Sequence, residues 1–433
     1  MSGVMGKLIK EVFKNRLYHK GTGMPGAICT DSRSLENGQV FLALRGERFD
    51  GHGFLKTALE KGASGLIVSE RAALDGLDLK DAWVYVVRDT TAAYQELAKA
   101  YLETKPHLIK IGITGTSGKT TTKEFVRALL SVKYKVYANR GNYNNQIGVP
   151  LSMLEVGEEE IAVFEMGAGE PGDIERLSDL VRNQWAMVTA VGAGHLEFFG
   201  TVEGVAREKS KIAGYAHEAY CPRGILHGKY FKDFNKVDAR ALFSDICLSA
   251  SGYQFKLGVT ELSLPFWGEY NLDNFALAVV VALKLGLSPQ EIGEGIKAIQ
   301  IPSLRQEYKC KEGRHFWLDC YNANPLSMGK ALEGFAELPG AKIAVLADML
   351  ELGEDKGQLH REIGEELNTL SLSKVYFCGE LMREAYDVYR GPKGFYENKI
   401  KLTAELQRES KTGDVILLKA SRGMKLEEVY DMF

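Results

Sequence analysis

The clearest chemical signal in the sequence is a glycine-rich segment, Thr114-Gly-Thr-Ser-Gly-Lys-Thr120. It follows the apolar run 107–113 and opens an amphipathic pattern that continues to Leu130. Gly115 and Gly118 allow the backbone to curl so that successive N–H groups point inward, and a following helix adds the positive end of its dipole. The segment therefore predicts a phosphate-binding loop between a strand and a helix.

Two side chains of this loop have chemistry suited to a bound polyphosphate. Lys119 would place a positive charge on the β and γ phosphates, and the Thr120 hydroxyl would coordinate Mg²⁺. The register is unusual, because Ile113 stands where the common G-x-x-x-x-G-K-[ST] pattern has glycine. The alternative is a glycine-rich turn that binds nothing. The nucleotide is expected to contact Thr116, Ser117, Gly118, Lys119, Thr120 and Thr121.

Two further candidates follow predicted strands. Glu165 ends the apolar run 161–164 and precedes a glycine-rich stretch, 166–172. His195 follows the run 186–191 and a Gly-Ala-Gly turn. Ligands of a parallel sheet gather at the carboxyl ends of its strands, and Mg²⁺ prefers oxygen ligands. Glu165 is therefore a candidate metal ligand, with a solvated strand end as the simpler alternative. His195 is a second candidate, for which a packed or surface histidine is the simpler alternative.

The segment 202–213 has a helical pattern and carries Lys209 and Lys211. From the residues alone, both lysines are expected on a solvated charged face.

An amide-rich loop, Asn142-Tyr-Asn-Asn-Gln-Ile-Gly148, precedes Val149-Pro150. Its asparagines Asn142, Asn144 and Asn145 are candidates for hydrogen bonds to a sugar or to an amide-bearing substrate. A turn built by asparagines explains the same composition equally well.

The surrounding elements predict an α/β protein of three domains, which matches the length of 433 residues. The predicted domains are a small α/β domain (1–105), a central P-loop ATPase domain with a mainly parallel sheet (106–301) and a Rossmann-like domain (302–433). The boundaries rest on Lys105-Pro106 and Ile301-Pro302. Predicted strands are 40–44, 65–68, 83–87, 316–318, 343–347, 374–378 and 415–418. Predicted helices are 91–103, 326–338, 358–367 and 404–410.

Composition limits the possible partners and the compartment. A net charge of −3 provides no basic field for nucleic acid. The six cysteines form no C-x-x-C pair and no zinc-finger spacing with histidine, which predicts a reducing, cytoplasmic setting. No run approaches eighteen apolar residues, and the charged start, 1–20, lacks the apolar core of a signal peptide. We therefore expect a protein that neither spans a membrane nor is exported.

Taken together, several motifs resemble those of the Mur ligases in order and spacing, nearly end to end. Besides the phosphate loop and the amide-rich loop, they are Glu165-Met-Gly-Ala, His195-Leu-Glu, Tyr270-Asn-Leu-Asp-Asn274, Asp319-Cys-Tyr-Asn-Ala-Asn-Pro325 and Asp348-Met-Leu-Glu-Leu-Gly353. The last two resemble the branch that adds D-alanyl-D-alanine to UDP-N-acetylmuramoyl-tripeptide in peptidoglycan synthesis. The Asp-Asn-Pro-Arg motif of the branch that adds meso-diaminopimelate does not occur.

The resemblance implies an N-terminal domain for the UDP-sugar, a central ATPase domain and a C-terminal domain that closes over the site. It also implies a reaction. ATP phosphorylates the terminal carboxylate of the UDP-muramoyl peptide, and the amine of the dipeptide attacks the acyl phosphate to give an amide, ADP and phosphate. The implied partners are the UDP-muramoyl-tripeptide and D-alanyl-D-alanine, and we expect the chain to act as a monomer.

The resemblance also implies roles for individual residues. Lys119, Lys209 and His195 are catalytic; two Mg²⁺ ions are held by Thr120, Glu165, His195 and Lys209, the last as a carbamate formed with CO₂. The remaining nucleotide contacts are the purine-binding Asn271 and Asn274, the phosphate-binding Arg305 and the ribose-binding Asp319. Substrate contacts are implied at Asp31, Ser32, Arg33, Asn322 and Asn324. Lys211 keeps its expected place on a solvated face.

Three positions depart from the family pattern. Tyr270 stands where histidine is common, Ala190 where asparagine often follows threonine, and Leu318 where a second acid often precedes Asp319. The first hundred residues carry the weakest match. Alternative functions are a third-residue-adding Mur ligase, a folylpolyglutamate synthetase and, in another class, a P-loop switch ATPase. A switch needs neither the amide-rich loop nor a third domain.

Overall fold

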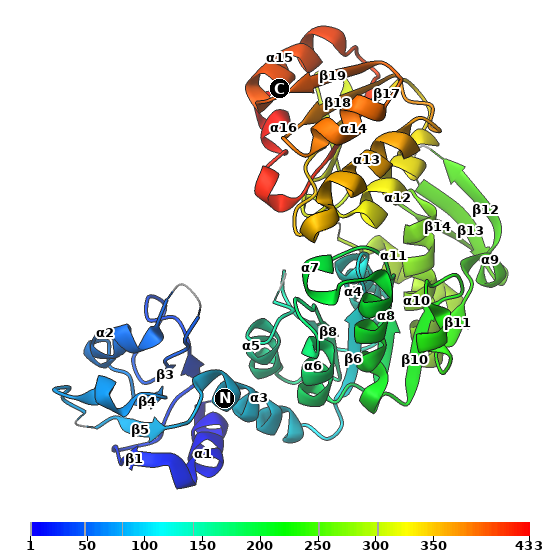
Figure 1. Ribbon diagram of the computed structural model, residues 1–433. Helices are drawn as coiled ribbons and strands as arrows, with labels where there is room; N and C mark the ends of the chain where they lie inside the picture. Colours follow the sequence, from blue (N-terminus) through cyan, green and yellow to red (C-terminus); the bar gives the residue numbers. More distant parts are fainter. Residues whose placement is uncertain (1, 47–48, 80, 142, 250–251, 301–302) are drawn as a thin grey trace. The chain divides into compact units, whose positions relative to one another are not determined.

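The structure is a computed structural model that describes all residues except 1, 47–48, 80, 142, 250–251 and 301–302. The chain forms two compact units (Figure 1). The first comprises residues 1–108, 142–158 and 179–182, and the second comprises residues 109–141, 159–178 and 183–433. The predicted boundary at Ile301-Pro302 and the candidate Asn142 lie outside the described residues, and the boundary positions stay predictions.

The first unit contains a five-stranded sheet in the order β1-β5-β4-β3-β2. Only β1 is antiparallel to its neighbour among these strands. The strands are β1 (Leu17–His19), β2 (Ile28–Cys29), β3 (Val40–Leu42), β4 (Gly65–Val68) and β5 (Trp83–Val86), and the helices are α1 (Ser2–Val12), α2 (Leu55–Glu60), α3 (Thr90–Glu103) and α5 (Gly148–Glu155). The predicted strand 40–44 thus ends two residues early, at Leu42.

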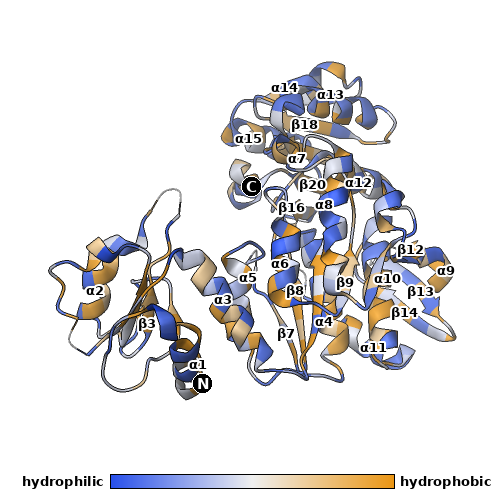
Figure 2. Ribbon diagram, turned by 60° about the horizontal axis from the view of Figure 1, so that its bottom comes forward, coloured by the Kyte–Doolittle hydropathy of each residue, from blue (hydrophilic) through white to orange (hydrophobic). Residues whose placement is uncertain are grey.

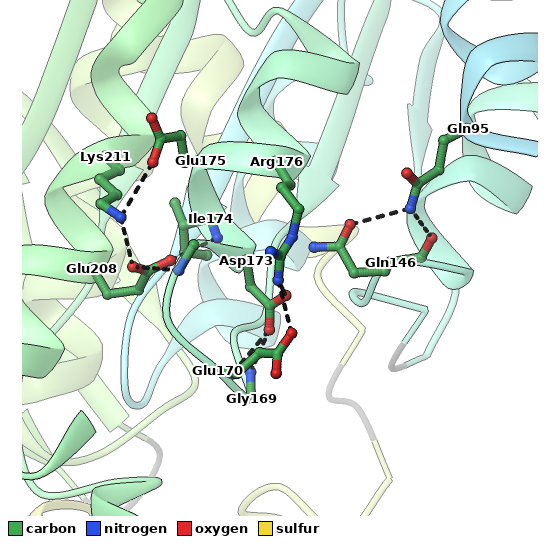
Figure 3. A network of polar contacts seen from close by, with 11 residues as sticks. Gln95, Gln146, Gly169, Glu170, Asp173, Ile174, Glu175, Arg176, Glu208 and Lys211 are labelled. Carbon is green, nitrogen blue, oxygen red and sulfur yellow. Dashed lines mark hydrogen bonds and ion pairs between the residues drawn. The ribbon is translucent and has the colours of Figure 1, made fainter. Parts of the chain in front are cut away.

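The segment 142–158 is part of the first unit although it lies well beyond residue 108 in sequence. The Gln95 side-chain amide on α3 donates to the Gln146 carbonyl at 2.9 Å and to its side-chain oxygen at 3.2 Å (Figure 3). The Tyr101 hydroxyl donates to the Val156 carbonyl at 2.8 Å. Leu151 and Leu154 pack against the core of this unit. The returning segment therefore completes the first unit's apolar core.

The second unit begins with six parallel strands in the order β11-β10-β9-β6-β8-β7. The strands are β6 (Ile109–Thr114), β7 (Val136–Ala138), β8 (Ile161–Glu165), β9 (Trp185–Val188), β10 (Glu218–Pro222) and β11 (Asn235–Val237). The helices are α4 (Lys119–Leu130), α6 (Asp173–Val181), α7 (Leu196–Phe199), α8 (Val202–Ser210), α9 (Ala239–Leu242), α10 (Glu269–Lys284) and α11 (Pro289–Lys297). Strands β8 and β9 are predominantly hydrophobic (Figure 2). The sheet confirms the predicted mainly parallel α/β fold.

The predicted helix 202–213 is wrong at its end. The α-helix stops at Ser210, and a 3-10 helix follows over Lys211–Tyr215. The Ser210 hydroxyl donates to the Arg207 carbonyl at 2.9 Å, and the Lys211 N–H bonds to the Glu208 carbonyl instead. Because serine takes the carbonyl that would continue the α-helical pattern, the last turn tightens.

A three-stranded antiparallel sheet was not predicted. It consists of β12 (Ser244–Ser249), β13 (Gly252–Leu257) and β14 (Thr260–Leu264). Its inner face joins the core formed by α4 and α10. Phe275 of α10 lies 5.9 Å from Phe255 of β13 and 5.5 Å from Phe125 of α4, measured between ring centroids. This aromatic cluster fixes α4, which follows the phosphate loop, against the rest of the unit.

The last part of the second unit is a six-stranded sheet in the order β15-β16-β20-β17-β18-β19, parallel except for β15. Alternate strand residues pack α12, α13 and α14 on one face and α15 and α16 on the other, as predicted for a doubly wound domain. The strands are β15 (Glu307–Lys311), β16 (Arg314–Asp319), β17 (Lys342–Ala347), β18 (Lys374–Cys378), β19 (Lys393–Tyr396) and β20 (Val415–Lys419). The helices are α12 (Pro325–Ala336), α13 (Lys356–Leu367), α14 (Met382–Val388), α15 (Lys399–Glu409) and α16 (Glu428–Met432). Among the described residues, no helix combines the length and apolar character needed to cross a bilayer.

Candidate active site

The glycine-rich segment forms a tight loop between β6 and α4, as predicted. Gly115 and Gly118 have φ angles of 153° and 81°, and Gly118 is the N-cap residue of α4. The Lys119 ammonium donates to the Gly115 carbonyl at 2.7 Å. Strand β6 lies between β8 and β9 in the sheet order, so the loop leaves the sheet where the connections diverge to either side. This is the position at which open α/β sheets bind ligands.

We predict that Gly118→Ala weakens nucleotide binding at least about tenfold, because the loop must change shape to accept the side chain. A Cβ atom there would lie 2.7 Å from the amide nitrogen of Asn274, and the positive φ disfavours any L side chain. Calorimetric titration with ADP measures the effect. Gly214→Ala is the matched control, because nothing lies within 4 Å of a Cβ atom at that position. Unchanged ADP affinity in Gly118→Ala would contradict the assignment of this loop.

A buried hydroxyl and a buried carboxylate meet behind the loop. The Thr120 hydroxyl donates to Glu165 Oε2 at 2.8 Å, and Glu165 is the last residue of β8. Asn139 holds the Glu165 backbone: its Oδ1 accepts from the Glu165 N–H at 2.8 Å, and its Nδ2 donates to the Glu165 carbonyl at 3.2 Å. The Lys123 ammonium lies 3.9 Å from the carboxylate. Hard oxygen donors of this kind suit Mg²⁺.

Lys209 is buried, contrary to the solvated face that the residues alone predicted. Only 3% of Lys209 is exposed. Burial, followed by the nearby positive charge of Lys119, lowers its pKa to about 7, and this outweighs the opposing effect of Glu208. Desolvation also lowers the pKa of Lys119. The amine of Lys209 is therefore available in its neutral, nucleophilic form near pH 7.

His195 has a left-handed backbone conformation, with φ of 52°, at the start of α7. Its Nδ1 lies 3.7 Å from a carboxylate oxygen of Glu351, which also has a positive φ of 63°. Burial lowers the pKa of His195, and the positive charges of Lys209 and Lys119 act in the same direction. The neutral imidazole that results is the form in which histidine can bind a metal.

A cavity of about 360 Å³ brings together residues from distant parts of the second unit. It is lined by every residue predicted to contact nucleotide: Thr116, Ser117, Gly118, Lys119, Thr120, Thr121, Asn271, Asn274, Arg305 and Asp319. Asn322 and Asn324 line the same cavity. Asn324 also caps α12, accepting from the Ser327 N–H at 2.9 Å. The Arg305 guanidinium lies 4.0 Å from the ring centroid of Tyr321.

Several lining residues escaped the sequence analysis. Lys419 donates to Asp319 at 2.6 Å. Asp319 lacks the second acid that often precedes it in the family, and it is paired with this lysine instead. Gln306 accepts from the Asn271 amide at 2.8 Å and donates to the Tyr270 hydroxyl. An apolar wall comes from the loop after β10, with Pro222, Gly224, Ile225 and Leu226. The short apolar run 219–221 ending at a proline was the available signal for this wall.

The remaining substrate candidates belong to the first unit. The Arg33 guanidinium donates to both carboxylate oxygens of Asp31, and this hydrogen bonding lowers the pKa of Asp31 to about 2. Lys61 donates to the Ser32 carbonyl at 2.8 Å. Asn145 Oδ1 accepts from the N–H groups of residues 147 and 148, at 3.1 and 2.8 Å. Asn145 therefore builds the turn before α5, and both Asn144 and Asn145 stay predicted substrate contacts.

Comparison with known families covers most of the chain. The Mur ligase family catalytic domain matches residues 26–124, the Mur ligase middle domain matches residues 113–282, and the Mur ligase glutamate ligase domain matches residues 304–422. The order of the three matches is the order of the three predicted domains.

Individual proteins are similar over nearly their whole length. The UDP-N-acetylmuramoyl-tripeptide--D-alanyl-D-alanine ligase of Bacillus subtilis is 34% identical, covering 98% of this chain and 96% of the relative, and that of Escherichia coli is 31% identical, covering 93% and 92%. Among solved structures, MurF from Acinetobacter baumannii has a TM-score of 0.91 at 30% identity, covering 99% and 98% of the two chains. MurF from Thermotoga maritima in complex with ADP has a TM-score of 0.82 at 30% identity, covering 94% and 96%.

Proposed function

The chain belongs to the Mur ligase family, and from this premise we propose that it joins D-alanyl-D-alanine to UDP-N-acetylmuramoyl-tripeptide with conversion of ATP to ADP and phosphate. Relatives of that name are similar over more than nine-tenths of the chain. The observation that carries the proposal is the single cavity that collects the phosphate loop, Asn271, Asn274, Arg305 and Asp319. We place the reaction in the cytoplasm, in keeping with six unpaired cysteine thiols.

The chemistry requires two anions, the γ-phosphate of ATP and the carboxylate of the UDP-muramoyl peptide, to approach each other. Lys119 supplies a fixed positive charge beside the phosphate loop, and Arg305 adds a second one at the cavity wall. These charges reduce the repulsion as the carboxylate attacks phosphorus and ADP leaves. The dipeptide amine then attacks the carbonyl carbon of the acyl phosphate, phosphate leaves, and the amide forms.

We also propose that the site holds Mg²⁺, with ligands from Thr120, Glu165, His195 and a carbamate on Lys209. The first two present hard oxygen atoms 2.8 Å apart, and the neutral amine of Lys209 can react with CO₂. The carbamate would turn a buried cation into an anionic oxygen ligand. Mg²⁺ held by these residues would neutralise negative charge on the phosphates of ATP. The oxygen donors of Thr120 and Glu165 therefore suit Mg²⁺, and we propose that His195, from the loop after β9, and Lys209, from α8, join them.

The test is a ligation assay with product detection. ADP release should depend strictly on both the UDP-muramoyl-tripeptide and D-alanyl-D-alanine, and mass spectrometry should show the amide product. ADP release with UDP-N-acetylmuramoyl-dipeptide and a single diamino acid, in place of the tripeptide and D-alanyl-D-alanine, would favour a third-residue-adding ligase. Release with a folate and glutamate would favour a folylpolyglutamate synthetase. Release that needs no acceptor would favour a switch ATPase and would overturn the proposal.

We further predict that the C-terminal domain closes when ATP and the acceptor are bound, because the acyl phosphate must be protected from water. The moving surface would include residues 348–353 and 419–422. Leu304 and Gln306, just before β15, have positive φ angles of 59° and 52°, which are unfavourable for L residues, and we expect the chain to rotate at this linker. Small-angle scattering with a non-hydrolysable ATP analogue and UDP-muramoyl peptide should show a smaller radius of gyration. An unchanged radius would count against closure.

A further inference from the structure

Glu208 has a role that the reaction described so far does not use. It precedes Lys209 on α8, and only 3% of it is exposed. Its two carboxylate oxygens accept hydrogen bonds from the backbone of another segment. Oε2 accepts from the Gly172 N–H at 3.0 Å, and Oε1 accepts from the Ile174 N–H at 2.9 Å (Figure 3). The first turn of a helix has N–H groups without partners inside the helix. Glu208 therefore caps α6 from a different helix.

The surroundings explain why a carboxylate is tolerated in this buried place. The Lys211 ammonium lies 3.1 Å from Glu208 Oε2 and 3.3 Å from the exposed Glu175 (Figure 3). The negative charge of Glu208 also faces the positive end of the α6 dipole. Two charge-assisted hydrogen bonds, an ion pair and a favourable dipole together offset the cost of burying the charge.

The capped segment is the loop that leaves the predicted metal ligand Glu165. Residues 166–172 connect the end of β8 to α6. Asp173 Oδ2 accepts from the N–H groups of Gly169 and Glu170 at 2.9 and 3.0 Å, and Arg176 holds the other oxygen of Asp173 at 2.8 Å. The loop is thus internally braced, and Glu208 connects the braced loop to α8.

We propose that Glu208 is a positioning residue for ligation: its carboxylate fixes the loop after Glu165 against the helical turn that carries Lys209. The inference rests on the proposed function, because it assumes that Glu165 and Lys209 act at one centre. Lys209 directly follows Glu208, and Glu165 lies at the other end of the loop that Glu208 holds at Gly172 and Ile174, so we expect a loosened loop to let the two groups move relative to each other. Catalytic groups lose rate when their supporting contacts let them move by about 1 Å.

The experiment compares Glu208→Gln with Glu175→Gln. Both variants remove one negative partner of Lys211 by the same chemical change, but only Glu208 bonds to the α6 backbone. In Glu208→Gln, one oxygen becomes an amide donor that faces a backbone donor. We expect kcat to fall about ten- to a hundredfold, since a displacement of catalytic groups by about 1 Å has effects of this size, and we expect the Mg²⁺ concentration for half-maximal rate to rise. The KM for ATP should stay within about threefold. Glu175→Gln should match the wild type.

A readout independent of activity accompanies the kinetics. Hydrogen–deuterium exchange measured by mass spectrometry should accelerate in peptides covering residues 166–174 in Glu208→Gln and not in Glu175→Gln. If Glu208→Gln does not fold, Glu208→Asp replaces it: aspartate keeps the charge near Lys211 but is too short to reach both N–H groups, so the same effects should appear in weaker form.

Two results would overturn the inference. One is that the Glu208 variant matches Glu175→Gln in kcat and Mg²⁺ dependence. The other is that its lower rate equals its lower folded fraction, which would make the residue structural only. If the wild-type enzyme ligates normally, either of these results contradicts only the role of Glu208 and leaves the proposed function intact. A wild-type enzyme that releases ADP without both substrates would instead overturn the proposed function.

Discussion

Lys119→Ala is expected to lower kcat for ligation at least about a hundredfold, because it removes a fixed positive charge that acts on the phosphoryl group during transfer. The side chain lines the cavity, its ammonium donates to the Gly115 carbonyl at 2.7 Å, and desolvation lowers its pKa. The loss should appear mainly in kcat rather than in the KM of either peptide substrate. Steady-state measurement of ADP release at saturating ATP, over a range of concentrations of each peptide substrate in turn, provides both values.

Lys133→Ala is a suitable control for that measurement. Lys133 lies beyond the other end of α4, is exposed, and donates to the Gly286 carbonyl at 2.8 Å. The variant removes the same side chain without touching the loop, and its kcat should equal that of the wild type. Near-normal ligation by Lys119→Ala would remove the assignment of Thr114–Thr120 as the phosphate-binding loop.

Lys209→Ala is expected to be nearly inactive and to regain part of its activity when a short carboxylate such as acetate or formate is added. The added anion would occupy the space of the missing carbamate and supply its oxygen atoms to the metal. Carbamate formation needs the neutral amine, and with a pKa of about 7 this form is lost as the pH falls below 7. At a fixed bicarbonate concentration, wild-type activity should therefore decline as the pH falls below 7, and ¹³C-bicarbonate at higher pH should give a carbamate signal in the ¹³C spectrum.

Lys211→Ala is the matched control for Lys209→Ala. Lys211 is two residues away but partly exposed, and it forms ion pairs with the exposed Glu175 and the buried Glu208. Without Lys211, Glu208 keeps both of its backbone hydrogen bonds to the start of α6, and these still satisfy its carboxylate. The variant should behave close to the wild type and show no response to acetate. Full activity in Lys209→Ala, or rescue of the Lys211 variant instead, would require a different second metal site.

The sequence predicted the parts of the site that depend on local rules. The glycines of the loop adopt positive φ angles because the loop must turn tightly between β6 and α4. Glu165 stands at the carboxyl end of β8, paired in register with Ile113 of β6, because neighbouring parallel strands present their ends at one edge. The alternating apolar runs likewise predicted both faces of the C-terminal sheet.

The sequence did not predict contacts between distant segments. Burial of Lys209 depends on how α8 packs, and the charged helical pattern of residues 202–213 does not indicate which of its lysines is buried. The cap that Glu208 places on α6 joins residues 34 to 36 positions apart, and the Gln306 contact with Asn271 spans 35. The sheet β12–β14 was missed because its strands have short alternating patterns that compete with turns for the same residues. In each case, tertiary packing decided the outcome rather than local preference.

The route of the chain through the two units also sets an order of assembly during synthesis. Residues 1–108 cannot bury α3 fully until the segment 142–158 has been made, because Leu151, Leu154 and the Val156 carbonyl complete that side. The first unit therefore finishes folding only after β6, the phosphate loop and α4 have left the ribosome. A fragment that ends near residue 105 would expose an apolar helix face to water and to other copies of itself. The nucleotide-binding loop is thus synthesised before the N-terminal core is complete, even though the two belong to different units.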